Sequence, residues 1–291
     1  MKRQKYQDVL ESLSEFDQWL STLGIPIRHD RFHRHLQNIR YLTELADTGN
    51  TQRLTHDQEI EIGWSLVEAL EFQDIYPMMR NYSSKHLKLV KQKMKDALKG
   101  QADPNSESTS SNLGRNTIFE LNLATRLMVK NIPVKLNKNP DILCSINGRD
   151  IFIECKRPFW EKNIPVNISR ATFQLTCGLN QAGTSSRGII AISISRLLNK
   201  GDKLFIGSDE ADMLERLADH VQSLGNKYKR TWDNIVDTRI IGILFHVITP
   251  SFIEDIKLYT TMQNFVVFNL SLPNSYDAHT LKLFSKLLSL S

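Results

Sequence analysis

The sequence predicts an α/β protein in which a mixed central sheet, flanked by helices, follows an all-helical N-terminal domain. Two observations support this fold class. Residues 1–100 repeat apolar side chains at helical spacings and contain no convincing strand. From residue 112 onward, helical stretches alternate with short apolar runs bounded by turn residues. Such alternation predicts a sheet that is covered by helices on both faces.

The N-terminal part divides into four expected helices and a polar segment. Helices are expected at residues 6–23, 31–45, 57–72 and 85–98. Residues 101–111 are small, polar and rich in turn-forming types, so they are predicted to be a linker. The chain is therefore expected to comprise a helical domain at 1–100, a linker at 101–111 and a second domain at 112–291.

The second domain is expected to begin with a helix, a hairpin and another helix. A buried helix is predicted at 116–130, a hairpin within 140–158 and a helix at 167–181 with Asn167 as its N-cap. Further strands are expected at 188–195, 240–248 and 265–270, with helices at 211–224 and 278–290. This succession supplies both the strands of the sheet and the helices that cover it.

The hairpin carries the most informative residues of the chain. Asn147-Gly148 is typical of a two-residue type I′ turn. Counting outward from this turn, Asp141 falls opposite Glu154, and Lys156 follows on the same face of its strand. The opposite, apolar face collects Ile142, Cys144, Ile146, Ile151, Ile153 and Cys155. One face is thus expected to be core, and the other carries a pair of acids.

Two carboxylates in this position need a compensating charge. Directly opposed residues have Cβ atoms about 4.5–5.5 Å apart, and like charges at that distance are destabilising. A hard divalent cation bound through carboxylate oxygens fits the need, with Lys156 as a fixed positive charge beside it. Two carboxylates, a bound cation and a lysine are suited to metal-assisted attack on a phosphodiester. The alternative is an ordinary half-exposed hairpin with surface acids. Asp255-Ile256-Lys257 shows that an acid-x-Lys triplet also occurs without a hairpin.

The residues Pro140-Asp141 and Glu154-Cys155-Lys156, with Glu120 on the preceding helix, resemble the PD-(D/E)XK nucleases, or restriction-endonuclease-like superfamily. The resemblance covers roughly residues 112–195. It implies a restriction-endonuclease-like core and a divalent-metal-dependent nuclease, with endonuclease favoured over exonuclease activity and DNA favoured over RNA.

The resemblance also implies roles for single residues. Asp141 and Glu154 would hold Mg²⁺, or Mn²⁺ in its place, and the Cys155 carbonyl would be a further metal ligand. Glu120 would ligate a second ion or a bound water. Lys156 would orient the attacking water or stabilise charge on the phosphate.

The position of Glu120 on the predicted helix 116–130 bears on its expected role. It shares a face with Leu123, Ala124 and Leu127, at spacings of three, four and seven. A carboxylate on such an apolar stripe needs a partner, which the metal site would supply. The alternative is an acid near the start of the helix that interacts with the helix dipole, with Asn116 as the N-cap.

Gln174 is an accessory candidate, again by resemblance. Many members of the superfamily carry a glutamine on the helix that follows the acid-x-Lys strand. The common Gln-x-x-x-Tyr form is absent because Gly178 stands at the tyrosine position. The alternative is a glutamine that simply faces solvent.

Two basic stretches are candidates for nucleic-acid contact. Lys88, Lys91 and Lys95 belong to a lysine-rich helix, which could track phosphates or could form a solvated face. Arg31 and Arg34 belong to the second stretch, where contact with nucleic acid is favoured over a metal pair made by His29 and His33. The net charge of +5 is compatible with a nucleic-acid partner.

Composition suggests the compartment and the assembly. Three cysteines without a C-x-x-C pair fit a reducing compartment, and no apolar run is long enough to span a bilayer. We therefore expect a cytoplasmic protein that is not a membrane protein. Cutting both strands of DNA calls for two active sites, which favours a homodimer. The rival functions are a catalytically silent nuclease-like subunit for nucleic-acid binding or assembly, and a helical interaction protein.

Overall fold

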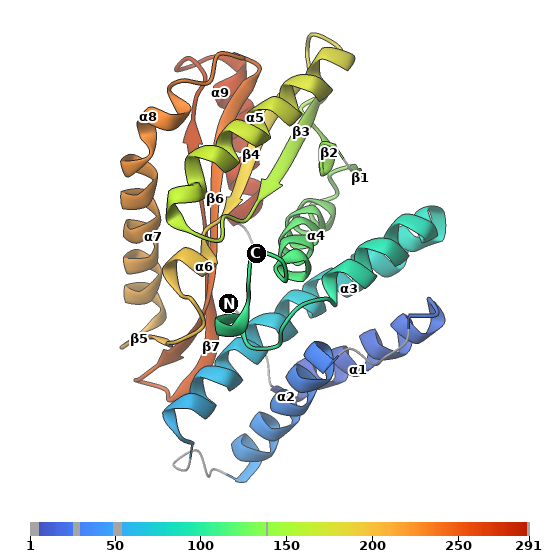
Figure 1. Ribbon diagram of the computed structural model, residues 1–291, viewed down its shortest axis with the longest axis vertical. Helices are drawn as coiled ribbons and strands as arrows, with labels where there is room; N and C mark the ends of the chain where they lie inside the picture. Colours follow the sequence, from blue (N-terminus) through green and yellow to red (C-terminus); the bar gives the residue numbers. More distant parts are fainter. Residues whose placement is uncertain (1–5, 26–29, 49–53, 138, 290–291) are drawn as a thin grey trace. The chain divides into compact units, whose positions relative to one another are not determined.

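The computed structural model describes residues 6–25, 30–48, 54–137 and 139–289 (Figure 1). The chain forms two compact units. The first comprises Met1–Asn122, Asn199–Met213 and Ile248–Met262; the second comprises Leu123–Leu198, Leu214–Val247 and Gln263–Ser291. This division does not coincide with the domain boundaries predicted from sequence. Residues 101–111, expected to be a linker between domains, lie inside the first unit.

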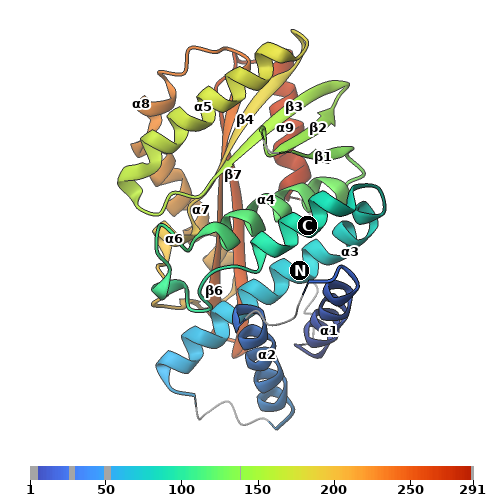
Figure 2. The same ribbon diagram turned by 45° about the vertical axis from the view of Figure 1, so that its right-hand side comes forward.

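Three helices form most of the first unit, where the sequence predicts four. They are α1 (Tyr6–Thr22), α2 (Asp30–Thr48) and α3 (His56–Ala97), and they pack on one another (Figures 1 and 2). Phe16 of α1 contacts Phe32 of α2 and Phe72 of α3, with ring centroids 5.4 and 5.1 Å apart. Aromatic burial of this kind holds the three apolar faces together.

Helix α3 replaces the two helices expected at 57–72 and 85–98. It begins with a capping box between Thr55 and Gln58 and continues through Pro77 to a kink at His86, where φ is −133° and ψ is 34°. The apolar stripe continues between the two expected helices through the buried side chains Ile75, Tyr76 and Met79. Tertiary packing therefore overrides the weak helix propensity of the intervening polar residues.

The segment predicted as a linker is partly structured. It contains a short 3-10 helix, η2 (Pro104–Ser106), whose N-cap Asp103 accepts a hydrogen bond of 2.8 Å from the Asn105 amide. Further along the chain, β5 (Phe205–Gly207) pairs in parallel with residues Ser251 to Ile253, also within the first unit. Strand β5 was not predicted from the sequence.

The seven described strands form one mixed sheet, which confirms the predicted α/β class. They are β1 (Val134–Leu136), β2 (Ile142–Ile146), β3 (Arg149–Lys156), β4 (Arg187–Ser193), β5, β6 (Ile240–Ile253) and β7 (Leu258–Asn269). The order is β1-β2-β3-β4-β6-β5, with β7 also paired to β6. Strands β1, β2 and β3 are antiparallel neighbours, whereas β3, β4, β6 and β5 are parallel.

Helices cover both faces of the second unit's part of the sheet. The unit contains the C-terminal end of α4 (Leu113–Val129), α5 (Ile164–Gln181), most of α7 (Glu210–Lys227) and α9 (Tyr276–Ser289), with the short elements η3 (Glu161–Asn163), α6 (Ser195–Leu198) and α8 (Lys229–Trp232). Helix α5 lies on one face and α9 on the other (Figures 1 and 2). Leu175 of α5 closely approaches Gly188 of β4, and Leu281 of α9 approaches Gly242 of β6.

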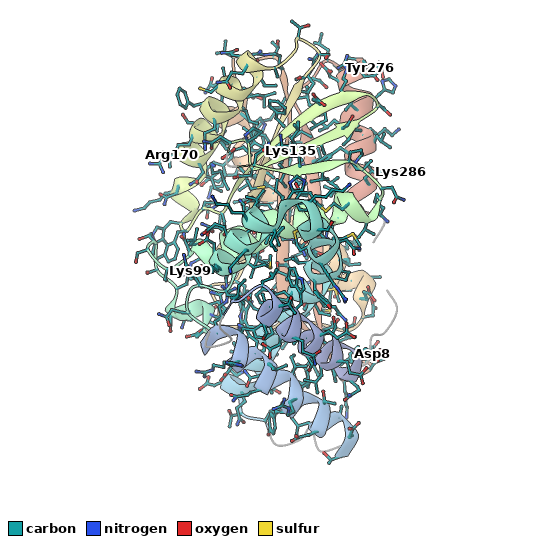
Figure 3. All side chains as sticks on the ribbon, turned by 90° about the vertical axis from the view of Figure 1, so that its right-hand side faces the viewer. Asp8, Lys99, Lys135, Arg170, Tyr276 and Lys286 are labelled. Atoms are coloured by element: carbon teal, nitrogen blue, oxygen red, sulfur yellow. The ribbon has the colours of Figure 1, made fainter. Side chains whose placement is uncertain are left out.

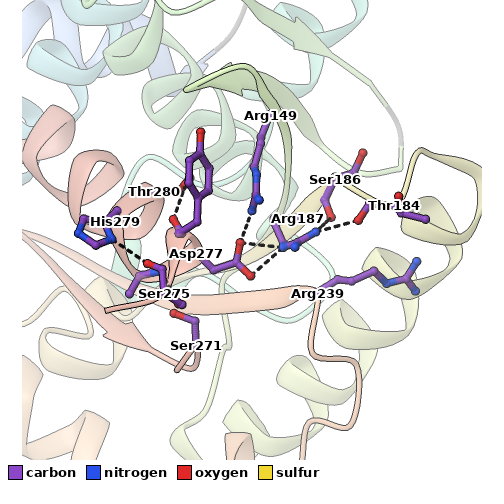
Figure 4. Close-up of polar contacts among 12 residues, drawn as sticks. Arg149, Thr184, Ser186, Arg187, Arg239, Ser271, Ser275, Asp277, His279 and Thr280 are labelled. Carbon is purple, nitrogen blue, oxygen red and sulfur yellow. Dashed lines mark hydrogen bonds and ion pairs between the residues drawn. The ribbon is translucent and has the colours of Figure 1, made fainter. Parts of the chain in front are cut away.

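An ion-pair cluster attaches α9 to the sheet (Figure 4). Asp277, in the first turn of α9, accepts hydrogen bonds from Arg149 at the start of β3 and from Arg187 at the start of β4. The Arg187 Nε lies 2.9 Å from each Asp277 carboxylate oxygen. Arg149 also lies over the Tyr276 ring, 4.0 Å from its centroid. An acid at a helix N-terminus is favoured by the helix dipole as well as by these cations.

Two predicted helix starts are wrong. Asn167 does not cap α5, because the helix already begins at Ile164. The side-chain amide of Asn167 donates a hydrogen bond to the Asn163 carbonyl at 2.8 Å. Asn116 does not cap α4, because its backbone amide donates to the Asn112 carbonyl inside the helix. In both cases an asparagine within the first turns of a helix resembled a cap in sequence.

Among the helices in the described ranges, none combines the length and the apolar character needed to cross a membrane. None of the three cysteines, Cys144, Cys155 and Cys177, forms a disulfide.

Candidate functional site

The β2–β3 hairpin has the predicted turn and register. Asn147 and Gly148 have φ of 51° and 71°, and positive φ at both positions is what a type I′ turn requires. The pairing of Ile142 with Ile153 is confirmed. Asp141 directly precedes β2, so the chain carries it to the position beside Glu154 that the sequence predicts.

Asp141, Glu154 and Lys156 are connected through β3. The Asp141 Oδ2 accepts a hydrogen bond of 2.8 Å from the backbone amide of Cys155. The Lys156 ammonium donates to Glu154 Oε1, with Nζ and Oε1 2.5 Å apart. Alternation along β3 puts Glu154 and Lys156 on one face. Three of the four residues implied by the resemblance therefore gather within the second unit.

The electrostatics of Glu154 are unusual for a carboxylate. Its side chain is 2% exposed. Burial, followed by the negative charge of Asp141, raises the pKa of Glu154 to about 7, while Lys156 acts in the opposite direction. Glu154 Oε2 is buried and has no hydrogen-bond partner among the residues that the structure describes. One neighbouring lysine thus compensates this pair of acids only in part.

The donor set fits a hard divalent cation. Asp141 and Glu154 provide carboxylate oxygens, and Cys155 lies between Glu154 and Lys156 on the strand with a backbone carbonyl to offer. The orphaned Oε2 of Glu154 is an oxygen to which a cation would give a partner. Within the described ranges, no group of three or more His, Cys, Asp or Glu side chains is placed to hold a metal. Carbonyls and waters would have to complete the coordination.

Helix α5 covers the face of β3 that carries Glu154. A Cβ built on Gly178 would lie 3.3 Å from the Phe152 ring and 3.5 Å from Pro140 Cδ. Gly178 is therefore a close-contact position, where any side chain would require the Phe152 ring to shift. One turn earlier, Gln174 Nε2 donates to Asn139 Oδ1 at 2.9 Å. The accessory candidate Gln174 is thus attached to the loop that carries Asp141.

Exposed cations lie on α5 and on β1. They are Arg170 on the helix and Lys135 on the strand (Figure 3). Both residues belong to the second unit, and neither was among the residues predicted to contact nucleic acid. Exposed cations of this kind are available for contact with phosphates.

Glu120 is buried on the apolar stripe of α4, as predicted, with Leu123, Ala124 and Leu127. It forms an ion pair with Lys93 of α3, and both residues belong to the first unit. Lys93 was not singled out from the sequence, although it belongs to the lysine-rich stretch of α3. The charge partner that a buried Glu120 requires is therefore supplied by a lysine.

The basic candidates differ in accessibility. Arg31 is 2% exposed; it forms an ion pair with Glu68 and donates to the Lys99 carbonyl at 2.7 Å. Because these partners bind its guanidinium inside the first unit, Arg31 is not exposed for contact with nucleic acid. Arg34 is exposed, with its Nε 2.6 Å from Glu61 Oε1.

The three lysines lie on the C-terminal half of α3. Lys88 is exposed, and Lys91 and Lys95 are half-buried. Lys91 Nζ lies 3.4 Å from a Cβ built on Gly24, which follows the C-terminus of α1, where a cation is favoured by the helix dipole. Lys99, just beyond the end of α3, is exposed as well (Figure 3). The less favoured alternative, a metal pair of His29 and His33, involves His29, which lies outside the described residues.

None of the protein-family models, curated proteins or solved structures compared with the chain matches it. The geometry of the site itself is therefore the basis on which a function can be inferred. That geometry consists of the Asp141 and Glu154 carboxylates, the Lys156 ammonium and the helix that covers them.

Proposed function

We propose that the protein is a divalent-metal-dependent nuclease of the PD-(D/E)XK type, with DNA as the favoured substrate and endonuclease as the favoured activity. The observation that carries the proposal is Glu154. It is a buried acid beside a second acid and a lysine, with one oxygen that lacks a partner among the described residues. A structural role alone gives no reason to hold a carboxylate in such a costly environment.

Each residue has a role that its chemistry supports. Asp141 and Glu154 would hold Mg²⁺ or Mn²⁺, with the Cys155 carbonyl as a further ligand. When bound, such a cation lowers the pKa of water and offsets negative charge on a phosphate. Lys156 orients the attacking water or stabilises the charge that develops on the phosphate. The hydrogen bond from the Cys155 amide holds Asp141 in position.

The remaining candidate residues have supporting roles in the proposal. Gln174 supports the loop of Asp141 through Asn139. Lys88, Lys91, Lys95 and Arg34 are the remaining candidates for contact with phosphates. Glu120 would act as a ligand only if substrate or metal broke its ion pair with Lys93. A homodimer would supply the two active sites that a double-strand cut needs. We place this nuclease in the cytoplasm.

A catalytically silent nucleic-acid-binding or assembly subunit is the second candidate. One observation favours it: Glu120, the third acid of the implied set, is already neutralised by Lys93. A protein of this type would bind nucleic acid without cutting it. Cleavage assays separate the two candidates directly.

The decisive experiment incubates the purified protein with plasmid, linear duplex DNA, single-stranded DNA and RNA, each with Mg²⁺, Mn²⁺ or EDTA. Lys156→Ala is tested alongside. Its matched control is Lys257→Ala, which alters the acid-x-Lys triplet that lies in the turn between β6 and β7. We expect metal-dependent cleavage that falls at least about 100-fold in Lys156→Ala and is unchanged in Lys257→Ala.

Two results would overturn the nuclease proposal. Cleavage that survives Lys156→Ala would place the activity elsewhere or in a contaminant. An absence of cleavage on all four substrates, with nucleic-acid binding intact in wild type and Lys156→Ala, would establish the silent binding subunit instead.

A further inference from the structure

Two exposed aromatic side chains lie near the proposed cleavage site in the second unit, and the cleavage chemistry uses neither. Trp160 is 45% exposed and Phe173 is 71% exposed. Trp160 comes four residues after Lys156, so their Cα atoms are at most about 14 Å apart. Phe173 is next in sequence to Gln174, whose Nε2 donates to Asn139 in the loop before β2 at 2.9 Å. Both aromatic side chains therefore belong to segments that form the site.

Neighbouring residues hold Trp160 in position. Its ring packs edge-to-face against the buried Phe159, with ring centroids 4.8 Å apart. The guanidinium of Arg196 lies over the Phe159 ring, 3.9 Å from the ring centroid. The Trp160 carbonyl accepts a hydrogen bond of 2.9 Å from the backbone amide of Asn163, the N-cap residue of α5. An aromatic ring that is both fixed and exposed can stack on a planar group with little loss of conformational entropy.

Phe173 belongs to an exposed stripe along α5. Its members follow one another at spacings of four, three and four, which puts them on one side of the helix. They are Val166, Arg170, Phe173 and Cys177, and all four are exposed. Helix α5 contains no Asp or Glu. The stripe thus combines aromatic and apolar surface with one cation.

The segment that carries these side chains is positively charged. Residues 155–195 contain five Lys and Arg residues and one acid, Glu161. Lys227 pairs with that acid, with Nζ and Oε1 2.5 Å apart. Lys162 and Arg170 are exposed. Their charge complements the phosphates of a nucleic acid.

An aromatic surface of this kind distinguishes unpaired bases from paired ones. In a duplex the neighbouring bases cover each base face, so an aromatic side chain has no face to contact unless a base leaves the stack. In a single strand the bases can splay out and stack on aromatic side chains while cations follow the backbone. The exposed tryptophan and phenylalanine, with Lys162 and Arg170 between them in the sequence, match the single strand.

A second copy of the chain fits this surface less well. In a symmetric dimer the same surface lies on both partners, so Lys162 and Arg170 would lie close to cations of the other copy. Helix α5 supplies no acid that could pair with them. Like charges brought together in this way would weaken such an interface.

We propose that the DNA substrate is single-stranded at the site and that Trp160 and Phe173 stack on its unpaired bases. Lys162 and Arg170 contact the phosphates of the same strand. This inference rests on the proposed nuclease function and specifies its substrate class. Binding of the strand does not require cleavage, so the two can be measured separately.

The first test measures binding by the full-length protein in EDTA, so that no strand is cut. All four tryptophans lie within the described residues, and Trp160 is exposed whereas Trp19, Trp64 and Trp232 are buried. The probes are an oligodeoxythymidine of about 12 nucleotides, its duplex with oligodeoxyadenosine, and an abasic strand of equal length. We expect the oligothymidine to quench the Trp160 fluorescence saturably and to bind at least about tenfold more tightly than the other two probes.

Variants then separate stacking from charge, with affinity followed by the anisotropy of labelled probes. Trp160→Ala and Phe173→Ala should each weaken binding of the oligothymidine about tenfold and leave the abasic strand unaffected. Arg170→Gln should weaken both strands alike and lower the salt dependence by about one phosphate contact. Leu272→Ala is the matched control, because Leu272 is a similarly exposed apolar residue of the second unit outside this surface.

Three results would contradict the inference. The first is equal affinity for the single strand and the duplex. The second is unchanged affinity in both Trp160→Ala and Phe173→Ala while cleavage continues, which would leave the nuclease proposal standing. The third is a dimer that becomes monomeric in Phe173→Ala without a change in affinity, which would make this surface a contact between copies. Binding that depends on Trp160 and Phe173, without cleavage in Mg²⁺, would support the surface and overturn the nuclease proposal alone.

Discussion

The Oδ2 atom of Asp141 lies 2.8 Å from the backbone nitrogen of Cys155 and accepts its hydrogen bond. This bond fixes the acid that precedes β2 to the strand position between Glu154 and Lys156. It also accounts for the influence of Asp141 on its neighbour, since the Asp141 charge is one of the two causes that raise the pKa of Glu154. The pair of acids is thus a property of the folded hairpin.

Asp141→Asn is expected to abolish stabilisation by divalent metal. In the wild type, Mg²⁺ or Mn²⁺ at 100 times its dissociation constant would add about 2.7 kcal/mol to the free energy of unfolding. The variant loses one of the two carboxylates that hold the cation. Thermal unfolding followed by circular dichroism, with metal varied from zero to millimolar, measures the difference.

Asp255→Asn is the matched control, because Asp255 belongs to an acid-x-Lys triplet in a turn with no second acid across a hairpin. It should keep the full metal response. Equal stabilisation of wild type and Asp141→Asn by metal would place any cation elsewhere in the protein.

Glu68→Gln is expected to destabilise the first unit strongly. Glu68 is 1% exposed and is paired with both Arg31 and Arg115; its Oε1 lies 2.7 Å from Arg115 Nε. Removing its charge leaves two buried guanidinium groups without their common partner, at a cost of about 3–5 kcal/mol. Urea denaturation measures this loss.

Glu61→Gln provides the comparison, since its pair with Arg34 is exposed on both sides. An exposed pair contributes about 0–1 kcal/mol, so the loss should be small. A loss in Glu68→Gln as small as that in Glu61→Gln would show that the two buried arginines find other partners.

His35 is expected to make the protein less stable as the pH falls below neutrality. Its pKa is lowered to about 3 by burial, whereas an unfolded histidine titrates at about 6.5. Between these values only the unfolded chain takes up the proton, so stability declines as the pH decreases. Between pH 7.5 and 5.0 this amounts to about 2 kcal/mol.

The measurement compares urea denaturation of wild type and His35→Asn across that pH range. His246, with its pKa also lowered to about 3, acts in the same direction, and Glu154 acts in the opposite one. Both remain in the variant, so the difference between the two proteins isolates His35. Parallel pH profiles for the two proteins would contradict the prediction.

Gly178→Leu is expected to disturb the packing of α5 on β3. A Cβ at this position already lies 3.3 Å from the Phe152 ring, so a larger side chain must displace the helix or the ring, at a cost of about 1–3 kcal/mol. Cys177→Leu is the control, because Cys177 is exposed on the same helix. Thermal unfolding compares the two variants; equal stabilities would mean that α5 moves freely over the strand.

The hairpin could be predicted because its signals are local. The Asn147-Gly148 turn fixes the pairing, and alternation along the strands then decides which side chains share a face. The same locality explains the success with α1, α2 and the positions of β4 and α7. Each of these elements repeats its own apolar period within a short window.

The sequence could not reveal contacts between distant parts of the chain. Arg31 resembled a surface cation, yet its partner Glu68 lies 37 positions away in the sequence. Glu120 resembled a metal ligand in search of a cation, yet Lys93 supplies one from 27 positions earlier. The continuation of α3 through Pro77 likewise depends on packing against α1 and α2. Sequence periodicity carries no information about such pairings.

The chain passes between its two units five times: within α4, directly after α6, and within α7, β6 and β7. No single cut of the backbone can therefore release either unit whole. A protease that cleaves within residues 101–111 would divide the first unit between two fragments, because its segments from β5, β6 and β7 stay in the C-terminal fragment. A gene fragment that encodes residues 1–100 would lack three segments of the first unit. Any continuous fragment that contains one unit whole also contains parts of the other unit.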